Sequence, residues 1–126
     1  MTPALPDILV GQMVALMTPL PPEAGGDYQA GRAGLVAMLA GLAAQEAERG
    51  VAVRVWENAA IRVVLGEAGA DTDLAWSALD LANADLRRKL IAAHVAAEAR
   101  GDEPLQREIL ALYQAMAKAR RLDLPS

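Results

Sequence analysis

A heptad repeat runs through the middle of the chain without a change of phase. A helix that buries one stripe against a neighbour has this 4-3 spacing. Because the repeat continues across Gly50, we predict one helix from about residue 28 to residue 67, roughly 60 Å long at 1.5 Å per residue. The positions of the repeat are Leu35, Leu39, Leu42, Glu46, Arg49, Val53, Trp56, Ala60 and Val63.

Gly50 is the position at which this helix could break. A glycine that ends a helix adopts a left-handed conformation and redirects the chain, so the two halves would have no reason to share a register. A glycine inside a helix costs only about 1 kcal/mol relative to alanine. We therefore favour the continuous helix, and two helices broken at Gly50 are the alternative.

Three shorter helices are predicted around the long one. Residues 1–20 hold a short apolar helix, from about Pro6 to Met17, that a proline-rich loop ends. A third helix covers residues 72–100, with Asp71 or Thr72 as its cap and Gly101 as its end. A fourth helix covers residues 103–122. The last two carry heptads of their own: Trp76, Leu79, Asn83, Leu86, Leu90, Ala93 and Ala97, then Leu105, Ile109, Leu112, Met116 and Ala119.

The predicted fold is therefore all-α, a single domain over residues 1–126 arranged as an antiparallel helical bundle on the long helix. That helix presents more apolar surface than two shorter helices can cover. A stripe of small residues beside its leucines would let another backbone approach closely, at Ala30, Gly34, Ala37, Gly41 and Ala44. We expect a second copy to complete the bundle as a homodimer.

Composition limits the chemistry and the partners. The absence of cysteine excludes thiol catalysis and disulfides and is typical of the cytoplasm. A net charge of -4 argues against binding nucleic acid. The uncharged run from Ile8 to Pro22 falls short of the roughly 20 apolar residues that span a bilayer, and no basic segment precedes it. We expect a cytoplasmic protein without cofactors.

Polar residues in and beside the seams form the candidate site: Glu46, Arg49, Arg54, Glu57, Asn58, Arg62 and Asn83. Two interpretations remain open. These residues are devices that set helix register and oligomeric state, or they line a polar pocket between the long helices. In the second interpretation Arg54 and Arg62 are candidates to bind an anion.

Motifs for catalysis or metal binding are missing from the sequence. His94 and Glu98 share a helix face, but two ligands are too few for zinc. The basic run Arg87–Lys89 is interpreted as a solvated face, with Asp85 able to pair with Lys89. The run Lys118–Arg121 is interpreted as a complement to the negative end of the last helix's dipole. The expected function is a non-enzymatic helical interaction protein that acts through self-association and a protein partner. The alternative is a small-molecule-binding or catalytic bundle that uses the Arg/Asn pocket.

Overall fold

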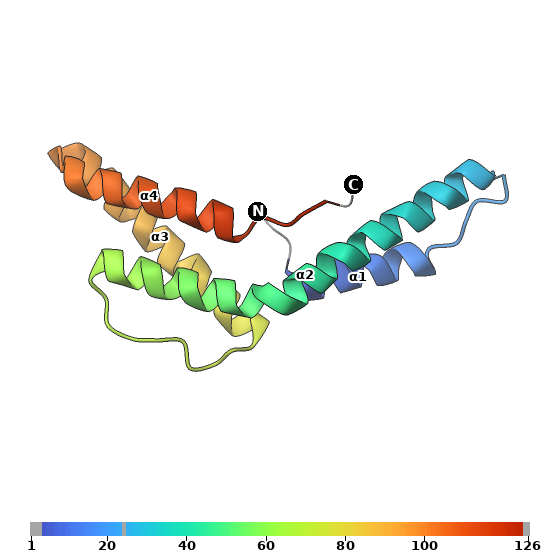
Figure 1. The fold of residues 1–126 in the computed structure, drawn as a ribbon, viewed down its shortest axis with the longest axis horizontal. Helices are drawn as coiled ribbons and strands as arrows, with labels where there is room; N and C mark the ends of the chain where they lie inside the picture. The colour runs from blue at the N-terminus through green and yellow to red at the C-terminus, as the bar shows by residue number, and fades with distance from the viewer. Residues whose placement is uncertain (1–3, 24, 125–126) are drawn as a thin grey trace. The chain divides into compact units, whose positions relative to one another are not determined.

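The fold is described by a computed structural model that covers residues 4–23 and 25–124. Within these ranges the chain forms four helices and no strand: α1 (Leu5–Met17), α2 (Gly26–Leu65), α3 (Trp76–Arg100) and α4 (Glu103–Ala119) (Figure 1). The predicted all-α fold is confirmed. None of these helices combines the length and the apolar character that crossing a membrane requires.

The long helix is continuous through Gly50, as predicted. Among the described glycines, a left-handed φ occurs at Gly66, Gly69 and Gly101, all outside α2. At Gly101, φ is 69° and the backbone N–H donates to the carbonyl of Glu98 at 3.2 Å, which ends α3 as the sequence suggested. Gly50 is therefore a helical residue within α2 and does not act as a cap.

The contacts within the chain divide it into two compact units. Met1–Gly50 with Leu122–Ser126 form the first, which we call the hairpin unit, and Val51–Arg121 form the second, which we call the bundle unit. The first half of α2 belongs to the hairpin unit and the second half to the bundle unit. That the chain acts as a single domain stays a prediction.

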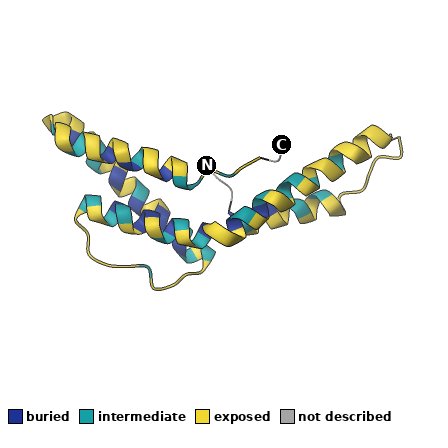
Figure 2. Cartoon of the chain, viewed as in Figure 1, coloured by how far each residue is buried: buried dark blue, intermediate teal, exposed yellow. Residues whose placement is uncertain are grey.

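In the hairpin unit, α1 runs antiparallel to the first half of α2 (Figure 1). The Gln12 side chain on α1 donates to the carbonyl of Val36 on α2 at 3.1 Å, and Arg32 donates to the carbonyl of Thr18 at 2.8 Å. The apolar core of this unit is small. Its buried apolar residues in the described ranges are Ala4, Ile8 and Ala43, and most of α1 is exposed (Figure 2).

In the bundle unit, an apolar core lies between the second half of α2, α3 and α4. The seams predicted on α3 and α4 are confirmed, because every one of their residues is buried or half-buried. The core is formed by Ile61, Leu86, Leu90, Ile109, Leu112 and Met116.

The seam predicted on α2 is partly wrong in the bundle unit, where Val53 and Ala60 are half-buried but the other two positions are exposed. Trp56 and Val63 are 42% and 77% exposed, whereas the buried positions of this segment are Arg54, Glu57, Asn58 and Ile61. Three of these four residues are polar. In this half of α2 the repeat of apolar residues therefore marks a stripe next to the buried face, and not the buried face itself.

The stripe of small residues on α2 does not receive another helix of the same chain. All five of its residues are exposed. A Cβ added at Gly34 or Gly41 would meet no atom within 4 Å. The stripe is therefore open within one chain, and the close approach of another backbone to it stays a prediction.

The third helix begins four residues later than predicted, at Trp76. Neither Asp71 nor Thr72 caps it. The carboxylate of Asp71 instead accepts hydrogen bonds from Asn58 and Arg62 on α2. The segment between α2 and α3 is thereby attached to α2 as an extended loop (Figure 1).

Candidate functional site

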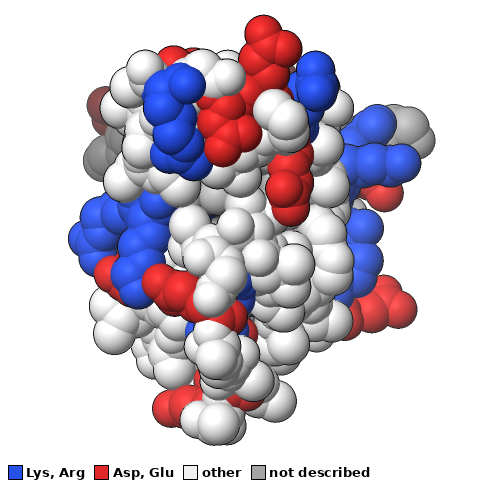
Figure 3. Space-filling model, turned by 90° about the vertical axis from the view of Figure 1, so that its left-hand side faces the viewer, with Lys and Arg blue, Asp and Glu red and all other residues white. Residues whose placement is uncertain are grey.

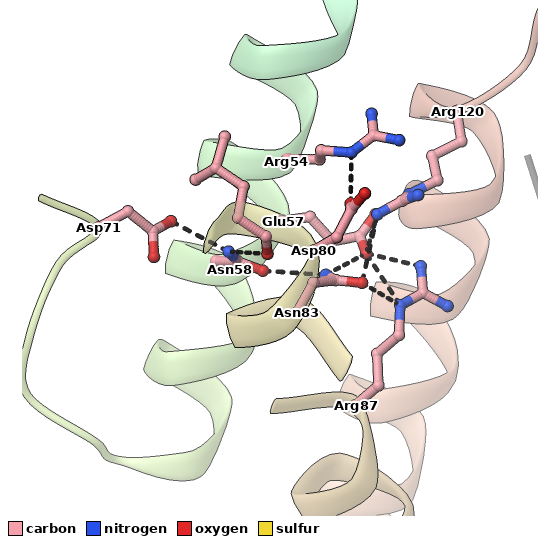
Figure 4. A network of polar contacts seen from close by, with 9 residues as sticks. Arg54, Glu57, Asn58, Asp71, Asp80, Asn83, Arg87 and Arg120 are labelled. Carbon is pink, nitrogen blue, oxygen red and sulfur yellow. Dashed lines mark hydrogen bonds and ion pairs between the residues drawn. The ribbon is translucent and has the colours of Figure 1, made fainter. Parts of the chain in front are cut away.

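Polar side chains from α2, α3 and the end of α4 meet inside the bundle unit (Figure 4). Five of the seven residues predicted as a site lie here: Arg54, Glu57, Asn58, Arg62 and Asn83. Four partners were not predicted: Asp71, Asp80, Arg87 and Arg120. We call these nine residues the polar cluster.

Glu57 is the centre of the polar cluster. Its side chain is fully buried, and its Oε1 accepts hydrogen bonds from Asn83 Nδ2 at 2.7 Å and from Arg87 Nη2 at 2.6 Å. Arg120 donates from Nε to Oε2 at 2.8 Å and from Nη2 to Oε1 at 3.1 Å. One carboxylate thus connects α2, α3 and the residue that follows α4.

The pKa of Glu57 reflects two opposed effects. Burial by itself raises the pKa, because it disfavours the charged form. The hydrogen bonds from Arg120, Arg87 and Asn83 favour that charged form, and together they hold the pKa of Glu57 below its ordinary value. Glu57 is therefore an ionised carboxylate at neutral pH, and it is a poor general acid.

The two asparagines orient each other. Asn83 Nδ2 donates to Asn58 Oδ1 at 2.9 Å, while Asn83 Oδ1 accepts from Arg87 Nε at 2.9 Å. Asn58 Nδ2 donates to Asp71 at 3.1 Å and to the carbonyl of Leu79 at 3.4 Å. Both amides use their oxygen and their nitrogen, so a slip of α2 against α3 by one turn would leave buried groups without partners.

Arg54 occupies one side of the polar cluster. Its side chain is 2% exposed, and its Nε donates to Asp80 Oδ1 at 2.7 Å. The guanidinium carbon lies 4.3 Å from the centre of the Trp76 ring, a cation-π arrangement. The carboxylate of Asp80 therefore balances the charge of the Arg54 guanidinium, and the indole of Trp76 covers one flat face of that group.

Arg62 joins the loop to α2. Its Nη2 donates to Asp71 Oδ1 at 2.9 Å, and its side chain is 15% exposed. Its Nη1 is buried and has no hydrogen-bond partner among the described residues. Of the buried side-chain nitrogen and oxygen atoms in these described ranges, it is the one atom without a partner. This atom is a buried donor of the polar cluster that has capacity left for another group.

Glu46 and Arg49, the other two predicted site residues, belong to the hairpin unit. Glu46 is buried, and Arg49 donates to Gln45 Oε1 at 3.1 Å, one turn away on α2. The same Gln45 exchanges two hydrogen bonds of 2.8 Å with the backbone of Asp123.

The interpretation of Arg87–Lys89 as a solvated face is partly wrong. Arg87 and Arg120 turn inward to Glu57, whereas Arg88 and Lys89 remain outside. Lys89 pairs with Asp85 at 3.4 Å, as predicted, and with Glu67 at 3.0 Å. On the face that Figure 3 shows, acidic and basic side chains lie next to one another. One signal for the missed partners on α3 was available, since Asp80 and Arg87 lie three residues before and four residues after the seam residue Asn83.

The arrangement offers little to a reacting molecule. The polar cluster contains four guanidinium groups and three carboxylates, which pair with one another but leave Arg62 Nη1 without a partner, and it contains no hydroxyl, thiol or imidazole. His94 stands apart, 3.5 Å from Glu98 and beside the Tyr113 ring. Within the described ranges, no group of three or more His, Cys, Asp or Glu residues could hold a metal ion.

The chain was compared with family models, with curated proteins and with solved structures. None of them matches it.

Proposed function

We propose that the chain is a non-enzymatic helical interaction protein that acts through self-association and through a protein partner. The observation that carries the proposal is the exposure of α1. Six large apolar side chains of this 13-residue helix are between 49% and 73% exposed: Leu9, Val10, Met13, Val14, Leu16 and Met17.

Such a surface is unusual for a chain that works alone. Apolar patches of more than a few hundred Å² are rare on monomeric soluble proteins and mark interaction sites. Covering a half-exposed side chain of this size contributes about 1 kcal/mol, since full burial contributes about 1.5–3 kcal/mol. Covering all six side chains therefore favours association by several times the free energy that covering one of them contributes.

The polar cluster supports a structural role for the bundle unit in this proposal. Its buried groups are paired with one another across three helices, which selects one register and one packing arrangement. A bundle unit with a unique packing presents its outer residues in constant positions, as a binding partner requires. The cluster then contributes specificity of folding, and recognition takes place elsewhere on the chain.

A second candidate function is a bundle that binds a small anionic molecule. The buried Nη1 of Arg62, which lacks a partner, favours it. If an anion binds there, adding phosphate or a small carboxylate should raise the melting temperature of the wild-type chain. The same addition should leave the melting temperature of Arg62→Met unchanged. Equal effects of the anion on both proteins would rule out this candidate.

The proposal places the protein in the cytoplasm. A chain of 126 residues without cysteine gains nothing from an oxidising compartment. Fractionation of cells that express the tagged chain would test this, and recovery from an extracytoplasmic fraction would contradict it.

Self-association is tested by the mass of the purified chain in solution. Light scattering at micromolar concentration should give about twice the 13.3 kDa of one chain, or a larger multiple. A mass of 13.3 kDa at every concentration would contradict the proposal.

A further inference from the structure

We infer that a second copy of the chain docks on a groove of the hairpin unit, an inference that rests on the proposed self-association. The groove lies between the end of α1, with the loop after it, and the first half of α2. Its volume is about 540 Å³, and it is lined mainly by Leu16, Leu20, Ala33, Val36, Ala37 and Ala40.

The shape of this surface suits a contact with itself. In a two-fold contact the same patch occurs on both sides, so it must carry projections as well as a hollow. Alanines form the floor of the groove on α2, and small side chains allow helix axes to approach to about 8 Å. On the same helix as the groove residue Leu16, Met13 and Met17 are exposed to solvent. Each copy thus offers a hollow and the side chains to fill it.

The absence of charge favours a second copy over other occupants. Residues 8–22 and residues 33–45 contain no Asp, Glu, Lys or Arg. In a two-fold contact every charge near the axis meets its own copy, and an uncharged patch avoids that repulsion. A membrane surface would require a row of basic residues, but Arg32 is the one basic residue among those that line the groove, and it already donates to the carbonyl of Thr18.

The small core of the hairpin unit requires a cover that is always present. Its buried apolar residues are few, so a helical hairpin left open would be marginally stable. A second copy is available whenever the chain is made, and folding coupled to such a contact is common in obligate dimers. Two helices of this length offer a face on the order of 600 Å², the scale of the roughly 800 Å² that each partner contributes to a stable contact.

A matched pair of substitutions on the full chain tests the location. Leu16→Glu changes a groove residue that is 62% exposed, and Leu81→Glu changes a residue of α3 in the bundle unit that is 73% exposed. Neither substitution buries a charge within one chain. We expect Leu16→Glu to weaken dimerisation at least tenfold by sedimentation equilibrium and Leu81→Glu to change it less than twofold.

A third variant covers the case in which Leu16→Glu disturbs the hairpin itself. Ala37→Glu places a charge on the groove floor from an exposed position of α2, and it should weaken dimerisation while leaving the helical circular dichroism unchanged. A dimer that Leu81→Glu disrupts, and that both groove variants leave intact, would overturn the inference but not the proposed self-association. A wild-type chain that is monomeric and binds vesicles of phosphatidylcholine and phosphatidylglycerol would overturn both.

Discussion

Glu57 and Arg120 form two hydrogen bonds, of 2.8 and 3.1 Å, although 63 residues separate them in the sequence. Arg120 directly follows α4, and Glu57 lies in the middle of the buried face of α2. Arg87 of α3 donates to the same carboxylate. The bundle unit is thus connected through one buried charge, and loss of that charge leaves two guanidinium groups facing each other.

Replacing Glu57 by glutamine should therefore destabilise the bundle unit strongly. Removing one partner of a buried ion pair costs about 3–5 kcal/mol, because the guanidinium of Arg120, which is 13% exposed, then stays largely buried without the compensating charge of Glu57. Urea denaturation measures the change in the free energy of unfolding. Glu98→Gln is the control, since its ion pair with His94 is 60% exposed on the Glu98 side and should contribute less than about 1 kcal/mol. Equal losses in the two variants would contradict the central role of Glu57.

Stability should also fall in acid through the same carboxylate. Although burial raises the pKa of Glu57, its three donors hold the pKa below the ordinary value, so the folded chain gives up this proton more readily than the unfolded chain. The resulting stability is complete above the unfolded pKa of about 4.3 and is lost as the pH falls through the lower folded pKa. The difference in unfolding free energy between wild type and Glu57→Gln should shrink over this interval, and a constant difference from pH 7 to pH 3 would count against it.

Arg54→Lys should lower stability although it preserves the charge. Lysine cannot reproduce the flat contact with Trp76 at 4.3 Å or the planar donor geometry toward Asp80. We expect a loss of about 1–2 kcal/mol, the size of a desolvated cation-π contact. Arg88→Lys, at a 75% exposed residue that pairs with Asp85, should change stability by less than about 0.5 kcal/mol. Thermal unfolding of the two variants would compare them directly.

Asp71→Asn should loosen the loop between α2 and α3. The carboxylate of Asp71 accepts from Arg62 at 2.9 Å and from Asn58 at 3.1 Å, and the amide would lose the charge that holds the guanidinium. Amides of residues 66–75 should then exchange their hydrogens faster. Asp73→Asn is the control, because Asp73 accepts from the Ala75 amide and contacts neither residue. Unchanged exchange in Asp71→Asn would show that the loop is held by other means.

The sequence predicted the helices better than the buried face of α2. The seams of α3 and α4 were found because leucine, isoleucine and methionine occupy their inward positions. On α2 the inward positions of the bundle unit are Arg54, Glu57 and Asn58, and a repeat based on apolar residues cannot identify them. The start of α3 was misplaced for a related reason. Aspartate is a residue type that often caps helices, but the carboxylate of Asp71 instead accepts hydrogen bonds from Asn58 and Arg62.

The candidate site was predicted in part, and the missing part has a physical cause. Polar residues near a seam were recognisable on α2 and at Asn83, since a heptad position makes them conspicuous. Arg87 belongs to a basic run whose charge predicts a solvated face, and Arg120 belongs to one whose charge complements the end of a helix dipole. Their inward direction depends on the position of Glu57, a relationship between distant segments that spacing along one helix does not contain.

Crosslinking between single cysteines measures most directly which surface of the chain lies at the contact between two copies. Because the chain has no cysteine, a single cysteine at Ala37 or at Ala84 can be treated with a flexible bifunctional maleimide. Both residues are exposed, the first on the groove of the hairpin unit and the second on α3. A contact between two copies through the groove predicts efficient crosslinked dimers for Ala37→Cys and little product for Ala84→Cys. Equal yields from both variants, or product from Ala84→Cys alone, would contradict it.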